Sequence, residues 1–170
     1  MQSVNRYPLL VAGVSGSGKS TLARGWAQRC TAPFIEGDQF HAPASVTKMR
    51  AGVPLEDADR ATWLDRLAAE MRSHPGLPAP VLACSALKRS YRERLRAGIQ
   101  GLRLVLLAVS PELAGARVAQ RADHYMPVML VASQFWTLEI PADEPHTLVL
   151  EGSRPVDELI LALDHWLAAS

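Results

Sequence analysis

The sequence has few cysteines and no long apolar segment. Two of its 170 residues are cysteine, and Cys30 and Cys84 form no Cys-X-X-Cys pair and have no histidine or cysteine cluster beside them. This pattern excludes a disulfide scaffold and favours neither a redox dithiol nor a zinc site. No apolar run approaches the roughly 18 residues of a membrane span, and residues 9–14 are too few for a signal-peptide core. We expect a soluble, cytoplasmic protein with no membrane partner.

The sequence also lacks an excess of charge of either sign. Its 18 basic and 17 acidic residues give a formal net charge of +1, so no global field gathers nucleic acid or an anionic membrane. We therefore expect no nucleic-acid partner, and any anion must be bound locally. Fifteen of the basic residues are arginine. This bias suits planar contacts to carboxylate or phosphate, and a GC-rich genome explains it equally well.

Short apolar segments alternate with helical patterns along the chain. Strands without polar positions are typical of a sheet that is covered on both faces, so the alternation predicts an α/β fold with a five-stranded parallel sheet and helices on both faces. At about 150 residues per domain, residues 1–170 form one domain. The predicted strands are 9–12, 32–35, 81–84, 102–109 and 147–150. The main predicted helices are 20–30, a helix that Asp57 or Asp59 caps and that ends before Gly76, 87–97, 111–121, 128–138 and 156–169. Ser110 is the predicted N-cap of the helix at 111–121, with Pro111 at its first position.

Two segments interrupt this alternation. Residues 39–60 contain Pro43, Gly52 and Pro54 and only a short helical pattern. This predicts an inserted cap, on the side of the ligand site where the acceptor discussed below would bind. Residues 121–128 break a helical pattern where a hinge would be useful, which predicts a lid. Arg117 and Arg121, four residues apart at the start of this break, can converge on one anion. Compensation of the helix dipole is the alternative role for the two arginines.

A phosphate-binding loop is the most specific motif in the chain. The segment Gly-Val-Ser-Gly-Ser-Gly-Lys-Ser matches G-x-x-x-x-G-K-[ST] at every fixed position and lies between a predicted strand and a predicted helix. Its backbone N–H groups can turn inward around a phosphate, at which the helix N-terminus also points. The residues expected to bind the nucleotide here are Gly13, Val14, Ser15, Gly16, Ser17, Gly18, Lys19, Ser20 and Thr21.

The motif implies a nucleoside triphosphate with Mg²⁺. Lys19 is expected to reach the β- and γ-phosphates, and the hydroxyl of Ser20 is expected to ligate the metal. The motif does not say which molecule receives the phosphoryl group.

Polar residues follow the second and third predicted strands. In open α/β sheets, ligands gather at the carboxyl ends of the strands, so these residues should face the phosphate-binding loop. Asp38 is the candidate that accepts or orients a hydroxyl proton for in-line attack. Three cations are expected near the same carboxyl ends of the strands: Arg60, Lys88 and Arg92. Their positive charge suits an acceptor that carries a carboxylate. His41 also follows the second strand, so it either faces the ligand or has a purely structural role.

The chain resembles the gluconate kinase family, the small P-loop gluconokinases, over almost its whole length. The run CSALK and the segment SQFWTLEIP are more selective than the phosphate-binding loop, which alone indicates only a superfamily. The resemblance is carried by residues 13–20, 36–41, 57–64, 84–88 and 133–141, and by Lys48, Met49, Gly52, Pro54, Leu55, Tyr91, Arg92, Leu95, Arg96, Arg117, Arg121 and His124.

The resemblance implies ATP-dependent phosphorylation of the C6 hydroxyl of D-gluconate, which yields 6-phospho-D-gluconate and ADP. It implies that Asp38 lies near the acceptor hydroxyl, that arginines of the lid close over the phosphates, and that a loop at residues 152–155 packs against adenine. A homodimer is plausible on the same ground. The remaining residues that match family positions are His41, Arg60, Lys88 and Arg92 around the sugar acid, Arg117 and Arg121 in the lid, and Arg154 and Pro155 in the adenine loop.

One position departs from the family pattern. The family commonly has aspartate where this chain has Glu36, and the longer side chain is expected to reach Mg²⁺ through a water. Other readings of the chain are a P-loop kinase of another small acceptor, such as shikimate or a nucleoside monophosphate, and a regulatory NTPase. A GTP switch would carry a guanine-reading N-K-x-D segment, and the sequence contains none.

Overall fold

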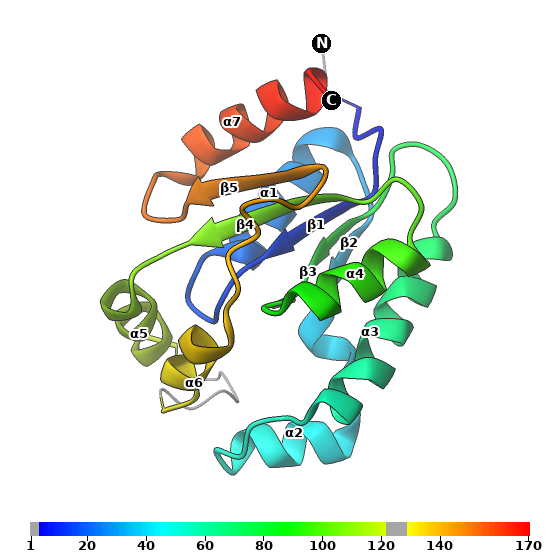
Figure 1. Cartoon of the computed structure of the whole chain (residues 1–170). Coiled ribbons are helices and arrows are strands. Elements are labelled where there is room, and N and C mark those ends of the chain that lie inside the picture. Colours follow the sequence, from blue (N-terminus) through cyan, green and yellow to red (C-terminus); the bar gives the residue numbers. More distant parts are fainter. Residues whose placement is uncertain (1–3, 122–128) are drawn as a thin grey trace.

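One parallel sheet forms the centre of the molecule. The computed structural model describes residues 4–121 and 129–170. Its strands pair in the order β2-β3-β1-β4-β5, and every pairing is parallel (Figure 1). The predicted five-stranded parallel sheet is therefore confirmed. The strands are β1 (Leu9–Ala12), β2 (Phe34–Glu36), β3 (Val81–Ala83), β4 (Arg103–Ala108) and β5 (Thr147–Glu151).

Helices connect the strands and begin close to the predicted positions. The helix predicted to reach Arg121 ends at Ala119, and the second strand extends to Glu36, which the prediction left outside it. No helix in the described ranges is long and apolar enough to cross a membrane. The helices are α1 (Lys19–Cys30), the 3-10 helix η1 (Gly37–Phe40), α2 (Pro43–Arg50), α3 (Asp57–Arg72), α4 (Arg89–Gly98), α5 (Pro111–Ala119), α6 (Met129–Thr137) and α7 (Val156–Ala168).

Capping residues set where two of these helices begin. The hydroxyl of Ser110 accepts the N–H of Leu113 at 3.2 Å, and a proline at the first helical position follows it, as the sequence predicted for α5. The predicted cap of α3 was Asp57 or Asp59. The cap is Glu56 instead, and Asp59 completes a capping box by accepting the N–H of Glu56 at 3.1 Å.

Successive side chains of the strands point into two separate cores. On one face, α3 and α4 cover the sheet, and Leu10 and Leu82 pack with Trp63 and Leu95. On the other face, α1 and α7 pack on the alternate strand positions (Figure 1). Each fully buried leucine contributes about 1.5–3 kcal/mol. Burial on both faces fixes the sheet, so the loops at the carboxyl ends of β1, β2 and β3 are presented from a rigid support.

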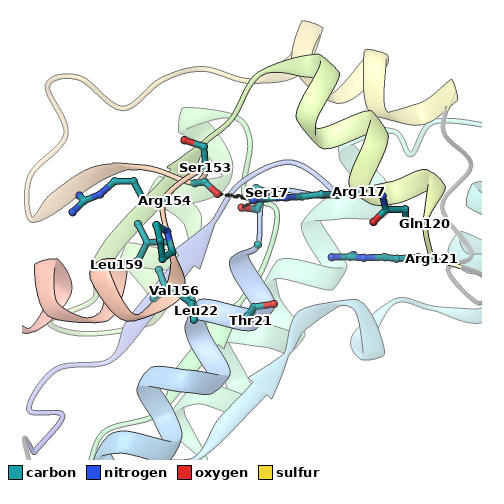
Figure 2. Close-up of a pocket in the computed structure, with 13 residues that line it drawn as sticks. Ser17, Thr21, Leu22, Arg117, Gln120, Arg121, Ser153, Arg154, Val156 and Leu159 are labelled. Carbon is teal, nitrogen blue, oxygen red and sulfur yellow. Dashed lines mark hydrogen bonds between the residues drawn. The ribbon is translucent and has the colours of Figure 1, made fainter.

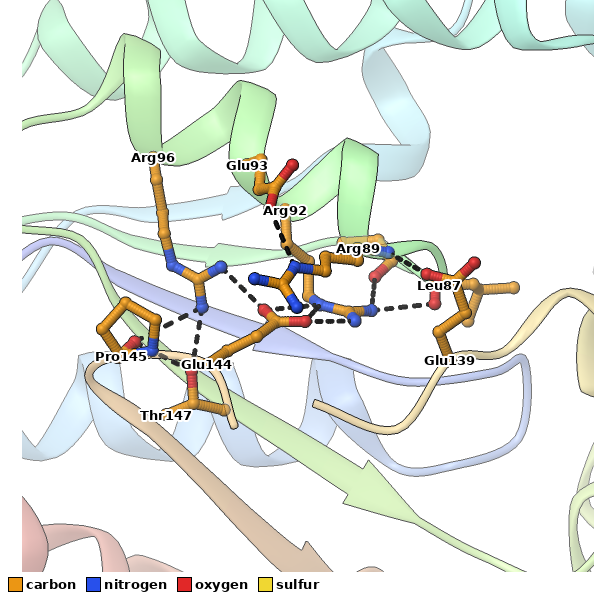
Figure 3. A network of polar contacts seen from close by, with 10 residues as sticks. Leu87, Arg89, Arg92, Glu93, Arg96, Glu139, Glu144, Pro145 and Thr147 are labelled. Carbon is orange, nitrogen blue, oxygen red and sulfur yellow. Dashed lines mark hydrogen bonds and ion pairs between the residues drawn. The ribbon is translucent and has the colours of Figure 1, made fainter. Parts of the chain in front are cut away.

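A buried ion-pair network ties the connection between α6 and β5 to α4 (Figure 3). The side chain of Glu144 is 4% exposed, and it pairs with Arg92 at 2.6 Å and with Arg96 at 2.7 Å. Arg92, which is 0% exposed, also donates from Nη1 to the carbonyls of Ala86 and Leu87. Together these bonds fix the residues after α6 relative to the N-terminus of α4.

Arg92 therefore does not lie where the sequence prediction put it. Its Nε, Nη1 and Nη2 atoms all donate to protein acceptors, and it lines none of the three cavities described below. The carboxylate that pairs with Arg92 belongs to Glu144, 52 residues further along the chain. No local sequence pattern links the two residues, so an arginine at the start of a helix beside the strand ends appeared available for substrate.

Replacement of Glu144 by alanine should destabilise the protein strongly. Removal of one partner from a buried ion pair leaves an uncompensated charge and costs about 3–5 kcal/mol. Urea unfolding measures the loss. The matched control is Glu93→Ala, because Glu93 forms an exposed pair with Arg89 that is worth about 0.3–0.5 kcal/mol. Equal destabilisation by the two substitutions would contradict the role given to the network.

Candidate active site

The turn after β1 has the backbone geometry that a phosphate-binding loop requires. Gly16 and Gly18 have φ angles of +81° and +92°, values that residues with a side chain rarely adopt. A Cβ atom on Gly16 would also collide with the carbonyl of Ala114 in α5. Gly18 is the N-cap of α1, which begins at Lys19. The N-terminus of α1, with the positive end of its dipole, therefore lies at the end of the loop. Within the loop, the N–H groups of Gly13, Ser15 and Ser17 donate to acceptors of the protein.

The loop separates two sets of cavities. Ser17, Gly18 and Thr21 line a large cavity of about 620 Å³ on one side, whereas Ser15 and Lys19 line a small cavity on the other side. We call the first the nucleotide cavity. Its other lining residues come from α1, the end of α5, the loop after β5 and the start of α7 (Figure 2): Leu22, Arg117, Gln120, Arg121, Gly152, Ser153, Arg154, Pro155, Val156 and Leu159.

Arg117 connects two walls of the nucleotide cavity. Its Nη1 atom donates to the carbonyls of Gly16, Ser17 and Gly152 at 3.2, 3.3 and 3.1 Å. Figure 2 shows the side chains of Arg117 and Arg121 extending from α5 and its C-terminal end into this cavity. The two arginines predicted to meet the phosphates therefore border the same cavity. Of the predicted lid, residues 122–128 lie outside the described residues.

The loop after β5 forms the opposite wall of the nucleotide cavity. Gly152 donates its N–H to the carbonyl of Ala108 at 2.7 Å, and a Cβ atom there would lie 2.8 Å from the carbonyl oxygen of Ser17. Only glycine allows this close approach of two backbones. Arg154 and Pro155, the residues predicted to lie by the adenine, follow directly and line the cavity. Arg154 pairs with Glu158 at 3.2 Å.

The small cavity brings together residues from five parts of the chain. Its volume is about 30 Å³, and a neighbouring hollow of about 120 Å³ opens beside it. Both are lined by Pro54, Leu55, Arg60, Ser133 and Gln134. We call the pair the acceptor cavities. The small one is also lined by Ser15, Lys19, Asp38, His41, Met49, Ser85 and Leu130, and the hollow by Glu56, Asp57, Leu87, Lys88, Tyr91 and Thr137.

His41 is held as a neutral ring in the small acceptor cavity. Its ring stacks on Trp63 with 4.1 Å between centroids and an angle of 18° between planes, and Trp63 is itself fixed by a 2.8 Å bond to the carbonyl of Gly37. Burial lowers the pKa of His41 to about 4, although the carboxylate of Asp38 acts in the opposite direction. Its Nδ1 is buried with no hydrogen-bond partner among the described residues. The ring can therefore exchange a hydrogen bond with a ligand hydroxyl.

The cations around the acceptor cavities differ in their partners. Lys88 pairs with Asp57 at 2.9 Å and lies 5.4 Å from the centre of the Tyr91 ring. Arg60 lies over the same ring at 5.6 Å and lines both acceptor cavities. Within residues 4–121 and 129–170, Arg60 forms no ion pair. It is thus the cation best placed to receive a carboxylate from a ligand, whereas Lys88 would first have to share its charge with Asp57.

Glu36 and Ser20 provide oxygen atoms suited to a divalent cation. Burial raises the pKa of Glu36, and the neighbouring Asp38 adds to this, while a hydrogen bond from Ser20 and the charge of Lys19 oppose it. Glu36 Oε1 is buried without a hydrogen-bond partner in the described part of the chain. A hydroxyl and a carboxylate with an unused oxygen fit the preference of Mg²⁺ for hard oxygen ligands. Among the described residues, no group of three or more His, Cys, Asp and Glu side chains is arranged so that it could hold a metal ion.

Two side chains on α6 were missed by sequence reasoning. Ser133 and Gln134 line both acceptor cavities, and Gln134 Oε1 accepts the N–H of Ser15 at 2.6 Å. Both belong to the segment SQFWTLEIP, which carried part of the family resemblance but received no role. The tertiary fold brings this segment to the phosphate-binding loop from 119 residues away, and that proximity has no local sequence signal.

Comparisons with known proteins agree with this geometry. A family model described as an AAA domain matches residues 9–137. The chain is 43% identical over 156 residues to a gluconokinase from Gluconobacter oxydans, a match that covers 89% of this chain and 86% of that protein. It is 41% identical over 137 residues to the thermosensitive gluconokinase of Escherichia coli, with 79% and 73% of the two chains covered.

Solved structures extend the comparison. A gluconokinase from Sinorhizobium meliloti superimposes with a TM-score of 0.86 at 38% identity and covers 97% of this chain and 93% of its own. A shikimate kinase from Aquifex aeolicus has a TM-score of 0.59 at 15% identity, over 95% and 96% of the chains, and shares the fold alone. By sequence over most of its length and by structure, the chain belongs to the gluconokinase family of P-loop kinases.

Proposed function

We propose that this protein transfers the γ-phosphoryl group of ATP to the C6 hydroxyl of D-gluconate and releases 6-phospho-D-gluconate and ADP. The observation that carries the proposal is the small acceptor cavity, in which Lys19 of the phosphate-binding loop, the carboxylate of Asp38 and the guanidinium of Arg60 line one space. Relatives named gluconokinase, at up to 43% identity, support the choice of acceptor.

The proposed reaction gives each of these groups a role. Asp38 accepts the proton of the C6 hydroxyl while the hydroxyl oxygen forms a bond to the γ-phosphorus and the bond to the β–γ bridging oxygen breaks. Lys19 neutralises charge on the phosphate oxygens, and Arg117 and Arg121 border the cavity from which the triphosphate enters. Positioning and electrostatic stabilisation supply most of the catalysis in such transfers.

The acceptor is identified by its charge. A carboxylate at the far end of a polyol would pair with Arg60, and Lys88 would add a second cation after exchange with Asp57. The neutral ring of His41 is suited to a hydrogen bond with one of the hydroxyls between the carboxylate and C6 of the polyol. These residues lie on or beside the predicted cap, residues 39–60, and its role in holding the acceptor is part of the proposal.

The cofactor assignments rest on the same geometry. Ser20 and Glu36 would hold Mg²⁺, whose contribution when bound is neutralisation of phosphate charge. Arg154 and Pro155 would flank the adenine in the nucleotide cavity, next to Gly152. A cytoplasmic location, where ATP and Mg²⁺ are available, completes the proposal. The homodimer that the resemblance implies stays a prediction.

A panel of acceptors tests the proposed substrate directly. ADP release should be stimulated by D-gluconate and not by shikimate, nucleoside monophosphates or neutral hexoses. Nucleotides and neutral hexoses lack the carboxylate that would pair with Arg60, and the relatives named gluconokinase favour gluconate over shikimate, which carries one. A coupled ADP assay with each acceptor measures this. Turnover with shikimate or a nucleotide and none with gluconate would remove the assignment, although the fold would be unchanged.

Asp38→Asn should reduce turnover by about 10²–10⁴-fold, because the variant keeps the shape of the side chain and loses the proton acceptor. The dissociation constant for ATP should change by less than about threefold. Steady-state kinetics and calorimetric titration of ATP separate the two effects. A wild-type rate in the variant would remove Asp38 from the reaction.

Arg60→Met should weaken binding of gluconate rather than the chemical step. Loss of a hydrogen bond to a charged group costs about 1.5–3 kcal/mol, which corresponds to a rise in the KM for gluconate of about 10–150-fold. Arg66→Met is the matched control, because Arg66 is exposed on the same helix. If both substitutions leave the KM for gluconate unchanged, Arg60 does not bind the carboxylate.

A further inference from the structure

The bond between Gln134 and Ser15 joins α6 to the phosphate-binding loop. Gln134 Oε1 accepts the backbone N–H of Ser15 at 2.6 Å, and both residues are buried, at 9% and 5% exposure. An amide oxygen that is held this closely by a backbone donor fixes the orientation of the whole carboxamide. The loop is thus attached to a helix that also lines both acceptor cavities.

The bond lies on the acceptor side of the loop. Ser15 lines the small acceptor cavity together with Lys19 and Asp38, whereas Ser17 and Gly18 line the nucleotide cavity. The N–H held by Gln134 therefore belongs to the part of the loop where the terminal phosphate and the acceptor hydroxyl must meet. A shift of this part moves the two reacting groups relative to each other without disturbing the rest of the nucleotide site.

The helix that carries Gln134 is itself held firmly. Glu139, two residues beyond its end, accepts the N–H of Arg89 at 2.6 Å and donates its own N–H to the carbonyl of Leu87 at 2.9 Å (Figure 3). Val131 packs with Val14 of the loop and with Leu87 in one apolar cluster. The arrangement therefore forms a continuous support from the N-terminus of α4 through α6 to the phosphate-binding loop.

We propose that Gln134 is a positioning residue that holds the acceptor-facing part of the loop, so that the γ-phosphoryl group passes to the bound acceptor and not to water. The inference rests on the proposed kinase activity. In either transfer the bond from the γ-phosphorus to ADP breaks and a bond to an oxygen forms. That oxygen belongs to the acceptor hydroxyl, whose proton goes to Asp38, or to water, whose proton goes to solvent.

The two transfers differ in how strongly they depend on position. A misplacement of about 1 Å lowers the rate of a positioned reaction by about 10²-fold. The acceptor is held by several groups and cannot follow a displaced phosphate, whereas water can approach from many directions. A loosened loop should therefore slow transfer to the acceptor and leave ATP hydrolysis nearly unchanged.

Gln134→Met tests the proposal, because methionine keeps the length of the side chain and removes the amide oxygen. ADP and phosphorylated gluconate are measured in the same reaction. We expect transfer to gluconate to fall by about 10²-fold, hydrolysis to persist, and the yield of phosphorylated gluconate per ADP to drop well below one. The KM for ATP should change by less than about threefold. Gln28→Met, at an exposed position of α1, is the matched control and should keep the wild-type yield.

Gln134→Glu separates positioning from packing. The carboxylate keeps an oxygen for the N–H of Ser15, so the yield per ADP should stay near one even where charge repulsion slows the enzyme. The oxygen of Gln134→Asn falls short of the loop, so this variant should behave like Gln134→Met. It is used in place of Gln134→Met if the Met variant unfolds at a much lower temperature than the wild type. Parallel loss of transfer and hydrolysis, or an unchanged yield in both the Met and Asn variants, would overturn the proposal.

The experiment also distinguishes this inference from the proposed substrate. If wild type phosphorylates another acceptor of the panel and not gluconate, the substrate assignment fails, and the yield per ADP with that other acceptor still tests Gln134.

Discussion

The tight backbone turn that follows β1 is the constraint on which the rest of the structure depends. Gly16 lies against the carbonyl of Ala114, Gly18 begins α1 in a left-handed conformation, and Gly152 approaches the carbonyl of Ser17. At Gly16 and Gly152 a side chain would separate elements that must touch, and at Gly18 a side chain would be strained by the left-handed backbone. The packing of α5 and of the loop after β5 therefore depends on the same glycines that shape the phosphate site, and stability and function are coupled here.

Much of the fold was predictable because its signals are local. Apolar strands such as residues 9–12, the proline after Ser110 and the glycine pattern before Lys19 each act within a few residues, and the structure follows them. The prediction that Asp57 or Asp59 caps α3 was wrong. The cap is Glu56, because the side chains of Glu56 and Asp59 each accept the other's backbone N–H, and the sequence interpretation had considered only the aspartates.

The site was predictable where it follows directly from strand ends, and less so elsewhere. Lys19, Asp38 and Arg60 line one cavity, as expected from their places after β1, after β2 and at the start of α3. Arg92 has an equally suggestive position and is instead buried against Glu144. Gln134 received no role although it contacts the loop. Both surprises come from pairings across long stretches of chain, which only the tertiary fold creates.

The central claim is that the loop and the carboxylate of Asp38 face each other across one acceptor cavity. A crystal structure with a non-hydrolysable ATP analogue, Mg²⁺ and D-gluconate tests it most directly. We expect the terminal phosphate at Lys19, the C6 hydroxyl within hydrogen-bonding distance of Asp38, and the carboxylate of gluconate at Arg60. Gluconate bound elsewhere, or with its carboxylate and not its C6 hydroxyl toward the phosphate, would contradict the account.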